Sequence, residues 1–391
     1  MRKIKIVRVI ARLNIGGPAI HVLNLTAKLD SNLFETILIT GCIGPNEGDM
    51  TYLAEALGVR PILVSELQRE ISPLDDVRAV ITLWRIFRRE RPDIVHTHTA
   101  KAGTIGRIAA LLARVPIIVH TFHGHVFHSY FPLRKTRFFV LIERLLALFS
   151  TYIVAISPRQ KEEIGAYLRS KERIVVIPLG FDLSRFVTAN NKDQARERLN
   201  LPKDKKIVGI VGRLAPVKNH KLFIWLAEES RKEDEDILFV IVGDGEERPR
   251  LERMVRERRL SDRVIFLGWQ KDIEIVYKAI DLLVLTSVNE GTPVAVIEAM
   301  ASGCPVLASC VGGVPDLIEH NKNGLLANPS DRRDFLEKMT YLLGDCQTRK
   351  DLARKGQEFV LKRYDLNRLL MDMTHLYLQN SSKKLRVKSE K

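Results

Sequence analysis

Short apolar runs alternate with amphipathic stretches along almost the whole chain. Apolar runs with polar boundaries are typical of strands buried on both faces, and the stretches between them show helical periodicity. Strands are expected in the first half at 4–10, 34–40, 61–64, 93–98, 116–121, 152–157 and 173–178, and in the second half at 206–214, 237–244, 264–268, 281–286 and 305–308. This alternation predicts an α/β protein with parallel sheets covered by helices on both faces.

The chain is long for a single hydrophobic core. Its 391 residues predict two domains. The segment 181–205 is polar and irregular, so we expect an N-terminal domain at 1–185, a linker at 186–205 and a C-terminal domain at 206–364. Helical patterns at 351–364 and 366–379 are followed by no further strand, and 381–391 is expected to be a mobile basic tail.

The composition indicates a globular protein without a membrane-spanning segment. Apolar residues make up 46% of the chain, but no run of about 18 of them occurs. Charges interrupt the apolar residues at the N-terminus, which favours a strand over a signal peptide. The four cysteines are scattered without zinc-binding spacing, so we expect a reducing compartment, the cytoplasm, and no structural metal.

The segment 281–300 carries the most specific pattern for chemistry. An apolar run is followed by a loop with Glu290, then by Pro293 and an apolar helical stretch with Glu298. Proline suits the first helical position, and the free N–H groups of a first helical turn bind anions. Glu298, one to two turns into the helix, would accept hydrogen bonds from a vicinal diol such as a ribose. The alternative is that Glu290 is a solvated loop charge and Glu298 a half-exposed helix residue.

A second loop is expected at the same edge of the same sheet. The run 207–211 ends in Gly212 and Arg213, and Lys218 lies at the start of the next helical pattern. Because ligands bind beyond the carboxyl ends of parallel strands, Arg213 and Lys218 would flank the crevice that contains Glu290. The Gly243-Asp244-Gly245 turn also suggests a dinucleotide-binding oxidoreductase, but that fingerprint needs a glycine where Arg248 stands.

With these motifs on one chain, the sequence resembles the retaining glycosyltransferases of family 4, which have the GT-B fold and a Glu-x7-Glu motif. The matching motifs are Gly16-Gly17, His123-Gly124, Gly212-Arg213, and Glu290 with Glu298. The resemblance implies two Rossmann-like domains with parallel sheets facing across a cleft, and a final helix at 365–380 that crosses back to the first domain. It implies sugar transfer from a nucleotide-sugar donor, with no cofactor and no metal.

The resemblance also assigns roles to individual residues. His123, Glu290, Arg213 and Lys218 would be catalytic. The donor would be bound by Gly16, Gly17, Gly212, Arg213, Lys218, Gly243, Gly291, Thr292, Pro293, Val294 and Glu298, and the acceptor by His21, His96, His98, Lys101 and His123. Three alternatives remain open for the first half, namely an ordinary glycine turn at 16–17, a core histidine at His123 and a zinc site that uses the histidines.

The basic residues of the first half bear on the partners. No Asp or Glu occurs between Asp93 and Glu143, which leaves six cations unopposed in the sequence, at Lys101, Arg107, Arg114, Arg134, Lys135 and Arg137. With neighbouring apolar residues, this charge favours an anionic membrane surface, and no nucleic-acid recognition motif accompanies it. Family members of similar sequence extend polyprenyl-diphosphate-linked saccharides for surface polysaccharides. We therefore expect a UDP-linked donor, a saccharide or lipid-linked saccharide acceptor and a location on the inner face of the cytoplasmic membrane.

A second function remains possible at this point. Other enzymes with the GT-B fold include sugar-nucleotide 2-epimerases and phosphorylases. A phosphorylase would need a lysine environment for pyridoxal phosphate, and an epimerase would need another set of carboxylates and histidines. Neither set is recognisable in the sequence, so glycosyl transfer is the preferred interpretation and the epimerase is the alternative.

Overall fold

The computed structural model describes residues 2–44, 48–68, 72–123, 133–168, 172–187, 191–231 and 234–389, without the side chains of 133–136, 138–139 and 380–389. Within these residues the chain forms two compact units. Unit 1 comprises Met1–Phe181 with Leu366–Lys391, and unit 2 comprises Asp182–Asp365. No helix of the described part is long and apolar enough to cross a membrane.

Unit 1 is built on a seven-stranded sheet in which all described pairings are parallel. The strands have the order β3-β2-β1-β4-β5-β6-β7. Their bounds are Ile4–Ile10 (β1), Phe34–Thr40 (β2), Ile62–Leu63 (β3), Ile94–His98 (β4), Ile117–Phe122 (β5), Tyr152–Ala155 (β6) and Ile174–Val176 (β7). The central strands β4 and β5 are buried at every position, including the polar residues that they contain, His96, Thr97, His98, His120 and Thr121.

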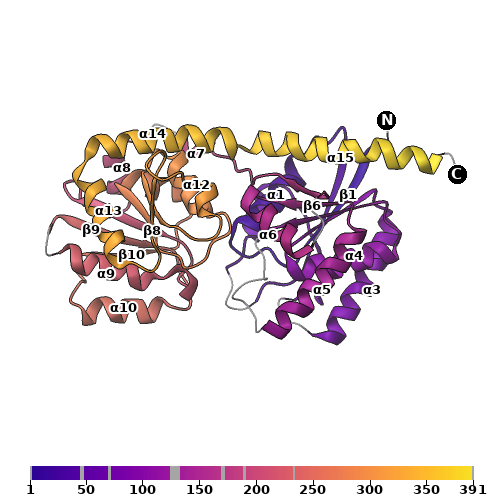
Figure 1. Cartoon of the computed structure of the whole chain (residues 1–391), viewed down its shortest axis with the longest axis horizontal. Helices are drawn as coiled ribbons and strands as arrows, with labels where there is room; N and C mark the ends of the chain where they lie inside the picture. The colour runs from indigo at the N-terminus through magenta and orange to yellow at the C-terminus, as the bar shows by residue number, and fades with distance from the viewer. Residues whose placement is uncertain are drawn as a thin grey trace. The chain divides into compact units, whose positions relative to one another are not determined.

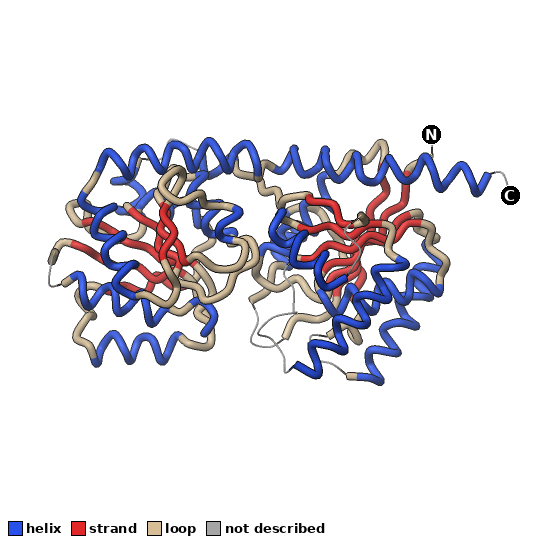
Figure 2. Tube along the Cα trace, in the orientation of Figure 1, coloured by secondary structure: helices blue, strands red, loops and turns tan. Residues whose placement is uncertain are grey.

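Helices cover both faces of this sheet (Figures 1 and 2). They are α1 (Gly17–Lys28), α2 (Thr51–Ala56), α3 (Pro73–Glu90), α4 (Ala100–Leu112), α5 (Leu133–Phe149), α6 (Pro158–Leu168) and α15 (Leu366–Ser389). Helix α3 packs along α4, and α4 also contacts α5. Asp75 and Asp76 lie in the first turn of α3, where acidic side chains are favoured by the helix dipole.

Unit 2 contains a six-stranded parallel sheet of order β10-β9-β8-β11-β12-β13. Its strands are Lys206–Val211 (β8), Ile237–Val242 (β9), Val264–Gly268 (β10), Leu282–Leu285 (β11), Val306–Ser309 (β12) and Leu325–Ala327 (β13). The α-helices are Ser184–Val187 (α7), Lys192–Arg198 (α8), His220–Ser230 (α9), Arg248–Glu257 (α10), Ile273–Ala279 (α11), Val294–Ala301 (α12), Arg332–Gly344 (α13) and Cys346–Arg363 (α14), and 3₁₀ turns occur at Pro216–Lys218 and Val314–Asp316.

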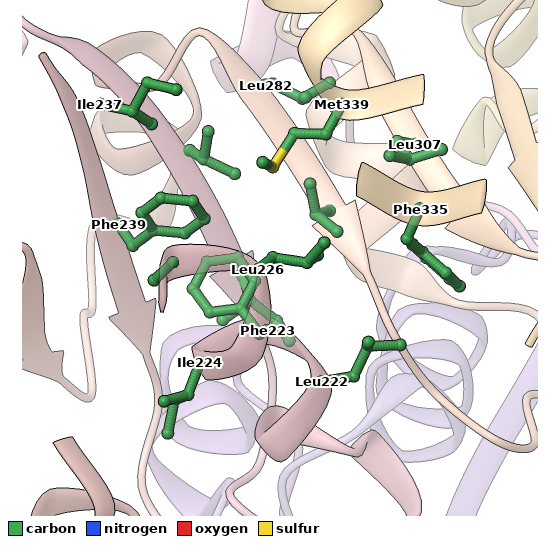
Figure 3. Close-up of a cluster of buried hydrophobic side chains, with 14 of the residues drawn as sticks. Leu222, Phe223, Ile224, Leu226, Ile237, Phe239, Leu282, Leu307, Phe335 and Met339 are labelled. Atoms are coloured by element: carbon green, nitrogen blue, oxygen red, sulfur yellow. The ribbon is translucent and has the colours of Figure 1, made fainter. Parts of the chain in front are cut away.

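The core of unit 2 lies between one face of the sheet and the helices α9 and α13. Phe223 and Leu226 of α9 pack with Phe239 of β9, and Phe335 and Met339 of α13 complete the cluster (Figure 3). The Phe223 and Phe239 rings meet edge to face, with centroids 5.3 Å apart. Burial of these side chains is the main favourable term in the stability of the unit.

The segment at 186–205 differs from the linker that the sequence suggested. It contains α8 and belongs to unit 2, because the buried Arg196 donates to the Ala279 carbonyl at 3.0 Å and pairs with Asp281 at 2.8 Å. The predicted tail also differs, since α15 continues to Ser389. The charged composition of 186–205 concealed a helix, α8, whose contacts are made with residues distant in the sequence.

Helix α15 belongs to unit 1 through an apolar face and a buried polar link. Leu369, Met373 and Tyr377 pack in a core cluster with strand residues such as Ile6. The Tyr377 hydroxyl lies 2.7 Å from His96 Nδ1, and His96 Nε2 lies 2.7 Å from Thr121 Oγ1. The C-terminal helix is therefore part of the interior of this unit.

Helices α4 and α5 are joined by a buried ion pair. The Arg107 guanidinium is 1% exposed and donates to both carboxylate oxygens of Glu143, at 2.6 and 2.7 Å. Lys101 pairs with Asp76 at 2.6 Å. The expectation that Lys101 and Arg107 are unopposed is therefore wrong, because their acidic partners lie outside the acid-free stretch of sequence.

We predict that Glu143→Gln destabilises the protein by about 3–5 kcal/mol, because the substitution leaves the Arg107 charge buried without a counterion. The measurement is the free energy of unfolding from urea denaturation. Glu358→Gln is the matched control: it removes an exposed pair with Arg354 and should change stability by less than about 1 kcal/mol. Equal effects of the two substitutions would contradict the importance of the buried pair.

Candidate active site

The loops that follow β8 and β11 lie next to each other at the carboxyl edge of the unit 2 sheet. These strands are parallel neighbours, and the order of strands along the chain reverses between them. Open α/β sheets bind ligands at such a reversal. The backbone N–H of Val288 donates to the carbonyl of Val217 at 2.9 Å, so the two loops are held together directly.

Glu290 and Lys218 are in contact in this loop pair. Lys218 Nζ lies 2.6 Å from Glu290 Oε1, and the Ser287 hydroxyl donates to the same oxygen at 2.6 Å. The Glu290 side chain is only 9% exposed. It is therefore not a solvated loop charge. A carboxylate with a lysine and a hydroxyl on one oxygen keeps its second oxygen available for a ligand.

Sequence reasoning missed the segment that supports Glu290 from behind. Gly313 donates its N–H to the Glu290 carbonyl at 3.0 Å, and a Cβ at Gly312, where φ is +50°, would lie 1.9 Å from that carbonyl oxygen. Ser309 Oγ donates to the Ser287 carbonyl at 2.6 Å. The Gly312-Gly313 pair in the loop after β12 was the signal, because paired glycines often mark a close approach of two backbones.

The turn after β8 also depends on a close backbone approach. A Cβ at Gly243, where φ is +127°, would lie 2.1 Å from the Gly212 carbonyl oxygen. The Gly212 and Gly243 turns are therefore packed together. Arg213 is exposed, and its side chain has no hydrogen-bond or ion-pair partner among the described residues. Its guanidinium is available for an anion.

Helix α12 begins one residue later than the sequence suggested. Pro293 is the N-cap and Val294 the first helical residue, so proline precedes the helix instead of occupying its first position. Gly291 and Thr292 form the approach to this helix and are at least partly exposed. The free N–H groups of the first turn remain a site for negative charge.

Glu298 is half-buried on α12, and its carboxylate has one hydrogen-bond partner among the described residues. The buried Tyr277 hydroxyl donates to Glu298 Oε2 at 2.9 Å. Burial raises the pKa of Glu298 to about 7, although the Tyr277 hydrogen bond acts in the opposite direction. A ligand that donates hydrogen bonds to the carboxylate would favour its ionised form.

Unit 1 brings three histidines together at the carboxyl edge of its own sheet. Gly16 and Gly17 lead from β1 into α1, which carries His21, while His98 ends β4 and His123 follows β5. His98 Nδ1 lies 3.0 Å from His123 Nε2. The His21 ring meets the other two edge to face, at centroid distances of 5.7 and 4.9 Å. Gly124 lies outside the described residues.

These histidines are neutral at physiological pH. Burial lowers the pKa of His123 to about 3 and also lowers the pKa values of His21 and His98 well below their usual range. Among the described residues, both nitrogens of His21, His98 Nε2 and His123 Nδ1 have no hydrogen-bond partner. The cluster can therefore bind hydroxyl groups without contributing charge.

The same three histidines are the group of metal-ligating type that the described residues contain, with one nitrogen of each within 4.8 Å of the others. No carboxylate joins them, and the buried Arg8 guanidinium lies close enough to lower the pKa values of His21 and His98. A nearby fixed cation opposes the binding of a second one. This arrangement fits a site for hydroxyl groups better than a zinc site.

His96 and Lys101 do not join this cluster as free groups. His96 is fully buried, and both its ring nitrogens are occupied by Tyr377 and Thr121. Lys101 is paired with Asp76. The structure therefore places His96 within the fold, against the prediction of acceptor contact, and gives Lys101 a structural partner on α3.

Comparisons with known proteins decide the family. The family model for glycosyl transferases group 1 matches residues 191–359, and the model for glycosyltransferase family 4 matches residues 15–185. An Escherichia coli UDP-Gal:alpha-D-GlcNAc-diphosphoundecaprenol alpha-1,3-galactosyltransferase is 36% identical over 296 residues, which are 73% of this chain and 76% of that protein. The chain belongs to the family 4 glycosyltransferases.

Solved structures agree with this assignment at the level of the fold. HepE from Anabaena, determined in complex with UDP and glucose, superposes with a TM-score of 0.82 at 22% identity and covers 96% of this chain and 99% of its own. Sucrose-phosphate synthase from Thermosynechococcus elongatus has a TM-score of 0.81 at 24% identity and covers 97% of this chain and 100% of its own. This glycosyltransferase therefore has the GT-B fold, and the epimerase and oxidoreductase alternatives are set aside.

We predict that nucleotide-sugar binding to this glycosyltransferase strengthens as the pH rises through about 7 and weakens as the pH falls below it. A ribose diol that donates to Glu298 favours the carboxylate, whose pKa is about 7 in the free protein. Isothermal titration calorimetry from pH 6 to 8.5 measures this effect, because the phosphates of a nucleotide sugar do not titrate in that range.

Two variants sharpen this test. Glu298→Gln should bind about 1–3 kcal/mol more weakly at pH 8 and show little pH dependence. Tyr277→Phe removes a hydrogen bond that lowers the pKa of Glu298, so the midpoint should move to higher pH. A binding profile that is the same in Glu298→Gln as in the wild type would remove Glu298 from the nucleotide site.

Proposed function

We propose that this enzyme transfers a hexose from a UDP-linked donor to a saccharide carried on a polyprenyl diphosphate. The transfer retains the anomeric configuration, and it takes place in the synthesis of a cell-surface polysaccharide or lipopolysaccharide. Two comparisons support the donor and the acceptor class. The E. coli relative at 36% identity is named for UDP-Gal and for an undecaprenol-diphosphate-linked GlcNAc. HepE, with the same fold, was determined with UDP and glucose.

The contact of Lys218 with Glu290 is the observation that carries this proposal. Breaking the bond between a sugar and a diphosphate leaves negative charge on the phosphate and positive charge on the anomeric carbon. Lys218 and the exposed Arg213 supply cations for the leaving group, and the first turn of α12 supplies N–H donors. Glu290, beside Lys218, supplies negative charge for the sugar side.

The proposed mechanism uses neutral groups on the acceptor side. His123, with a pKa near 3, does not carry a proton at pH 7 and can hydrogen-bond a sugar hydroxyl through its unpartnered Nδ1. Same-face transfer lets the departing phosphate take the acceptor's proton, so Glu290 and Glu298 need not act as a general acid and base pair. Fixed cations at the leaving group make the transfer independent of a divalent metal.

The test is a transfer assay in excess EDTA with UDP-galactose, UDP-glucose, UDP-N-acetylglucosamine and GDP-mannose, each offered to undecaprenyl-diphosphate-linked GlcNAc and to free GlcNAc. We expect transfer from a UDP-hexose to the lipid-linked acceptor, and an α-linked product by NMR. Transfer only after manganese or magnesium is restored would contradict metal independence. Transfer to free GlcNAc alone would contradict the lipid-linked acceptor.

In the same assay, Lys218→Ala and Arg213→Ala should lower kcat at saturating donor by about 100-fold or more, because their charges stabilise the departing phosphate. Lys221→Ala, which removes an exposed lysine three residues beyond Lys218, is the matched control and should retain wild-type turnover. Full turnover of both Lys218→Ala and Arg213→Ala would contradict their role at the leaving group.

We also propose a peripheral location on the inner face of the cytoplasmic membrane. Helix α5 has a buried face that includes Glu143 and an exposed apolar face made of Leu141, Leu145, Leu148 and Phe149, which are 52–60% exposed. Arg137, one turn before Leu141, is exposed. The side chains of Arg134 and Lys135 lie outside the described residues. An apolar helix face with basic residues beside it suits the interface of an anionic membrane.

We predict that Leu145→Ser with Leu148→Ser weakens binding to phosphatidylglycerol vesicles by about 2 kcal/mol, roughly 30-fold, since each leucine loses about half of a full burial energy. Cosedimentation with vesicles measures this. Tyr341→Ser removes an apolar side chain of similar exposure in unit 2 and serves as the control. Vesicle binding that is unchanged by the leucine substitutions would exclude α5 as the docking face.

A further inference from the structure

A basic hollow lies at the amino edge of the unit 1 sheet, the edge opposite to the histidine cluster. It has a volume of about 730 Å³ and is bounded by the residues that precede β1, β4 and β5 and by the C-terminal ends of α3 and α4. These three strands are adjacent at the centre of the sheet. The histidines and Gly16 follow the carboxyl ends of the same strands, so the hollow is separate from the site of transfer.

Five cations line this hollow, and one carboxylate balances one of them. Asp93 is 5% exposed and accepts hydrogen bonds from Arg2 at 2.9 Å and from the Lys5 N–H at 2.9 Å. Its charge is therefore committed to Arg2. The other lining cations, which have no carboxylate partner among the described residues, are Lys3, Arg88, Arg91 and Arg114.

The positions of Arg91 and Arg114 need an explanation. Each directly follows a helix, α3 or α4, and has a positive φ, of 47° and 57°. Glycine or asparagine fits this left-handed position with less strain than arginine. A cation at a helix C-terminus is favoured by the dipole, which accounts for each arginine singly. The helix dipole does not explain why two helix ends and the N-terminal segment meet at one hollow, where four cations lack a described carboxylate partner.

We propose that this hollow binds a phosphate-bearing anion. Guanidinium groups recognise phosphate oxygens in pairs, and the hollow is large enough for more than one phosphate or for a phosphorylated headgroup. The site lies outside the donor and acceptor sites, and its existence does not depend on the transfer reaction. The ligand is the phosphate of a lipid headgroup or a soluble diphosphate or polyphosphate.

The exposed face of α3 favours the lipid as the source. Leu74, Val77, Ile81 and Trp84 are 37–74% exposed and are spaced three or four residues apart, so they form one apolar stripe along the helix. Arg88, which lines the hollow, follows Trp84 by one turn on the same face. A headgroup in the hollow would therefore have an apolar helix face and an interfacial tryptophan beside it.

The test uses substitutions that remove charge from the hollow but leave the backbone conformation unchanged. Arg91→Asn with Arg114→Asn removes two lining charges, and asparagine tolerates the left-handed region. Arg259→Asn is the matched control, because Arg259 also has a positive φ, of 54°, just beyond the end of α10 in unit 2. Pyrophosphate binding is measured by equilibrium dialysis with saturating UDP, which fills the proposed nucleotide site. We expect binding about tenfold or more weaker in the double variant and unchanged in the control.

Vesicles distinguish the two sources of phosphate. If the ligand is lipid-borne, the double variant also loses binding to phosphatidylglycerol vesicles, and pyrophosphate competes with the vesicles for the wild-type protein. If the ligand is soluble, the double variant binds pyrophosphate more weakly but binds vesicles as the wild type does. Pyrophosphate and vesicle binding that are both the same in the double variant and in Arg259→Asn would overturn the proposal. The proposed function is tested separately, by the transfer assay and by the Leu145→Ser and Leu148→Ser variants. Pyrophosphate binding in the hollow requires neither transfer activity nor the two leucine side chains.

Discussion

The proposed donor site depends on the parallel pairing of β8 with β11. These neighbouring strands end at the same edge of the sheet, so the loops that carry Lys218 and Glu290 leave the sheet side by side. The hydrogen bond from Val288 to Val217 and the packing of Gly312 on Glu290 then fix the loops in one arrangement. A lysine and a glutamate that are 72 positions apart in the sequence become a 2.6 Å contact.

The carboxyl edges of the sheets in the two units carry different kinds of polar side chain. In unit 2 the carboxyl edge carries ionisable groups that differ in their surroundings: Glu290 is beside Lys218, whereas Glu298 is next to a neutral tyrosine and has its pKa raised to about 7 by burial. In unit 1 the same edge carries histidines that burial keeps neutral. In the proposed reaction, the charged edge would bind the diphosphate and the neutral histidines would bind hydroxyl groups.

The sequence predicted the alternation of elements well because strands buried on both faces have continuous apolar runs. It missed β13, a strand of three residues that the apolar pattern did not distinguish from a loop. The proximity of Lys218 to Glu290 followed from the edge rule for parallel sheets. His96 could not be assigned correctly, because its role depends on Tyr377, which is 281 positions away on the last helix. Lys101 and Arg107 were misjudged for the same reason, since local charge counts do not reveal partners brought close by helix packing.

The amino edge of the unit 1 sheet also follows from the parallel topology, but its charge does not. In a parallel sheet all amino ends of the strands lie at one edge and all carboxyl ends at the other. Cations that precede the adjacent strands β1, β4 and β5 therefore lie close together at the amino edge. Folding alone would favour fewer unbalanced charges there, because like charges at close range repel and a left-handed arginine costs about 1 kcal/mol more than glycine. An anion in the hollow would lower both the repulsion and the cost of holding the arginines in place. The presence at this edge of four cations without a carboxylate partner in the described part of the chain is therefore better explained by a ligand than by the stability of the fold.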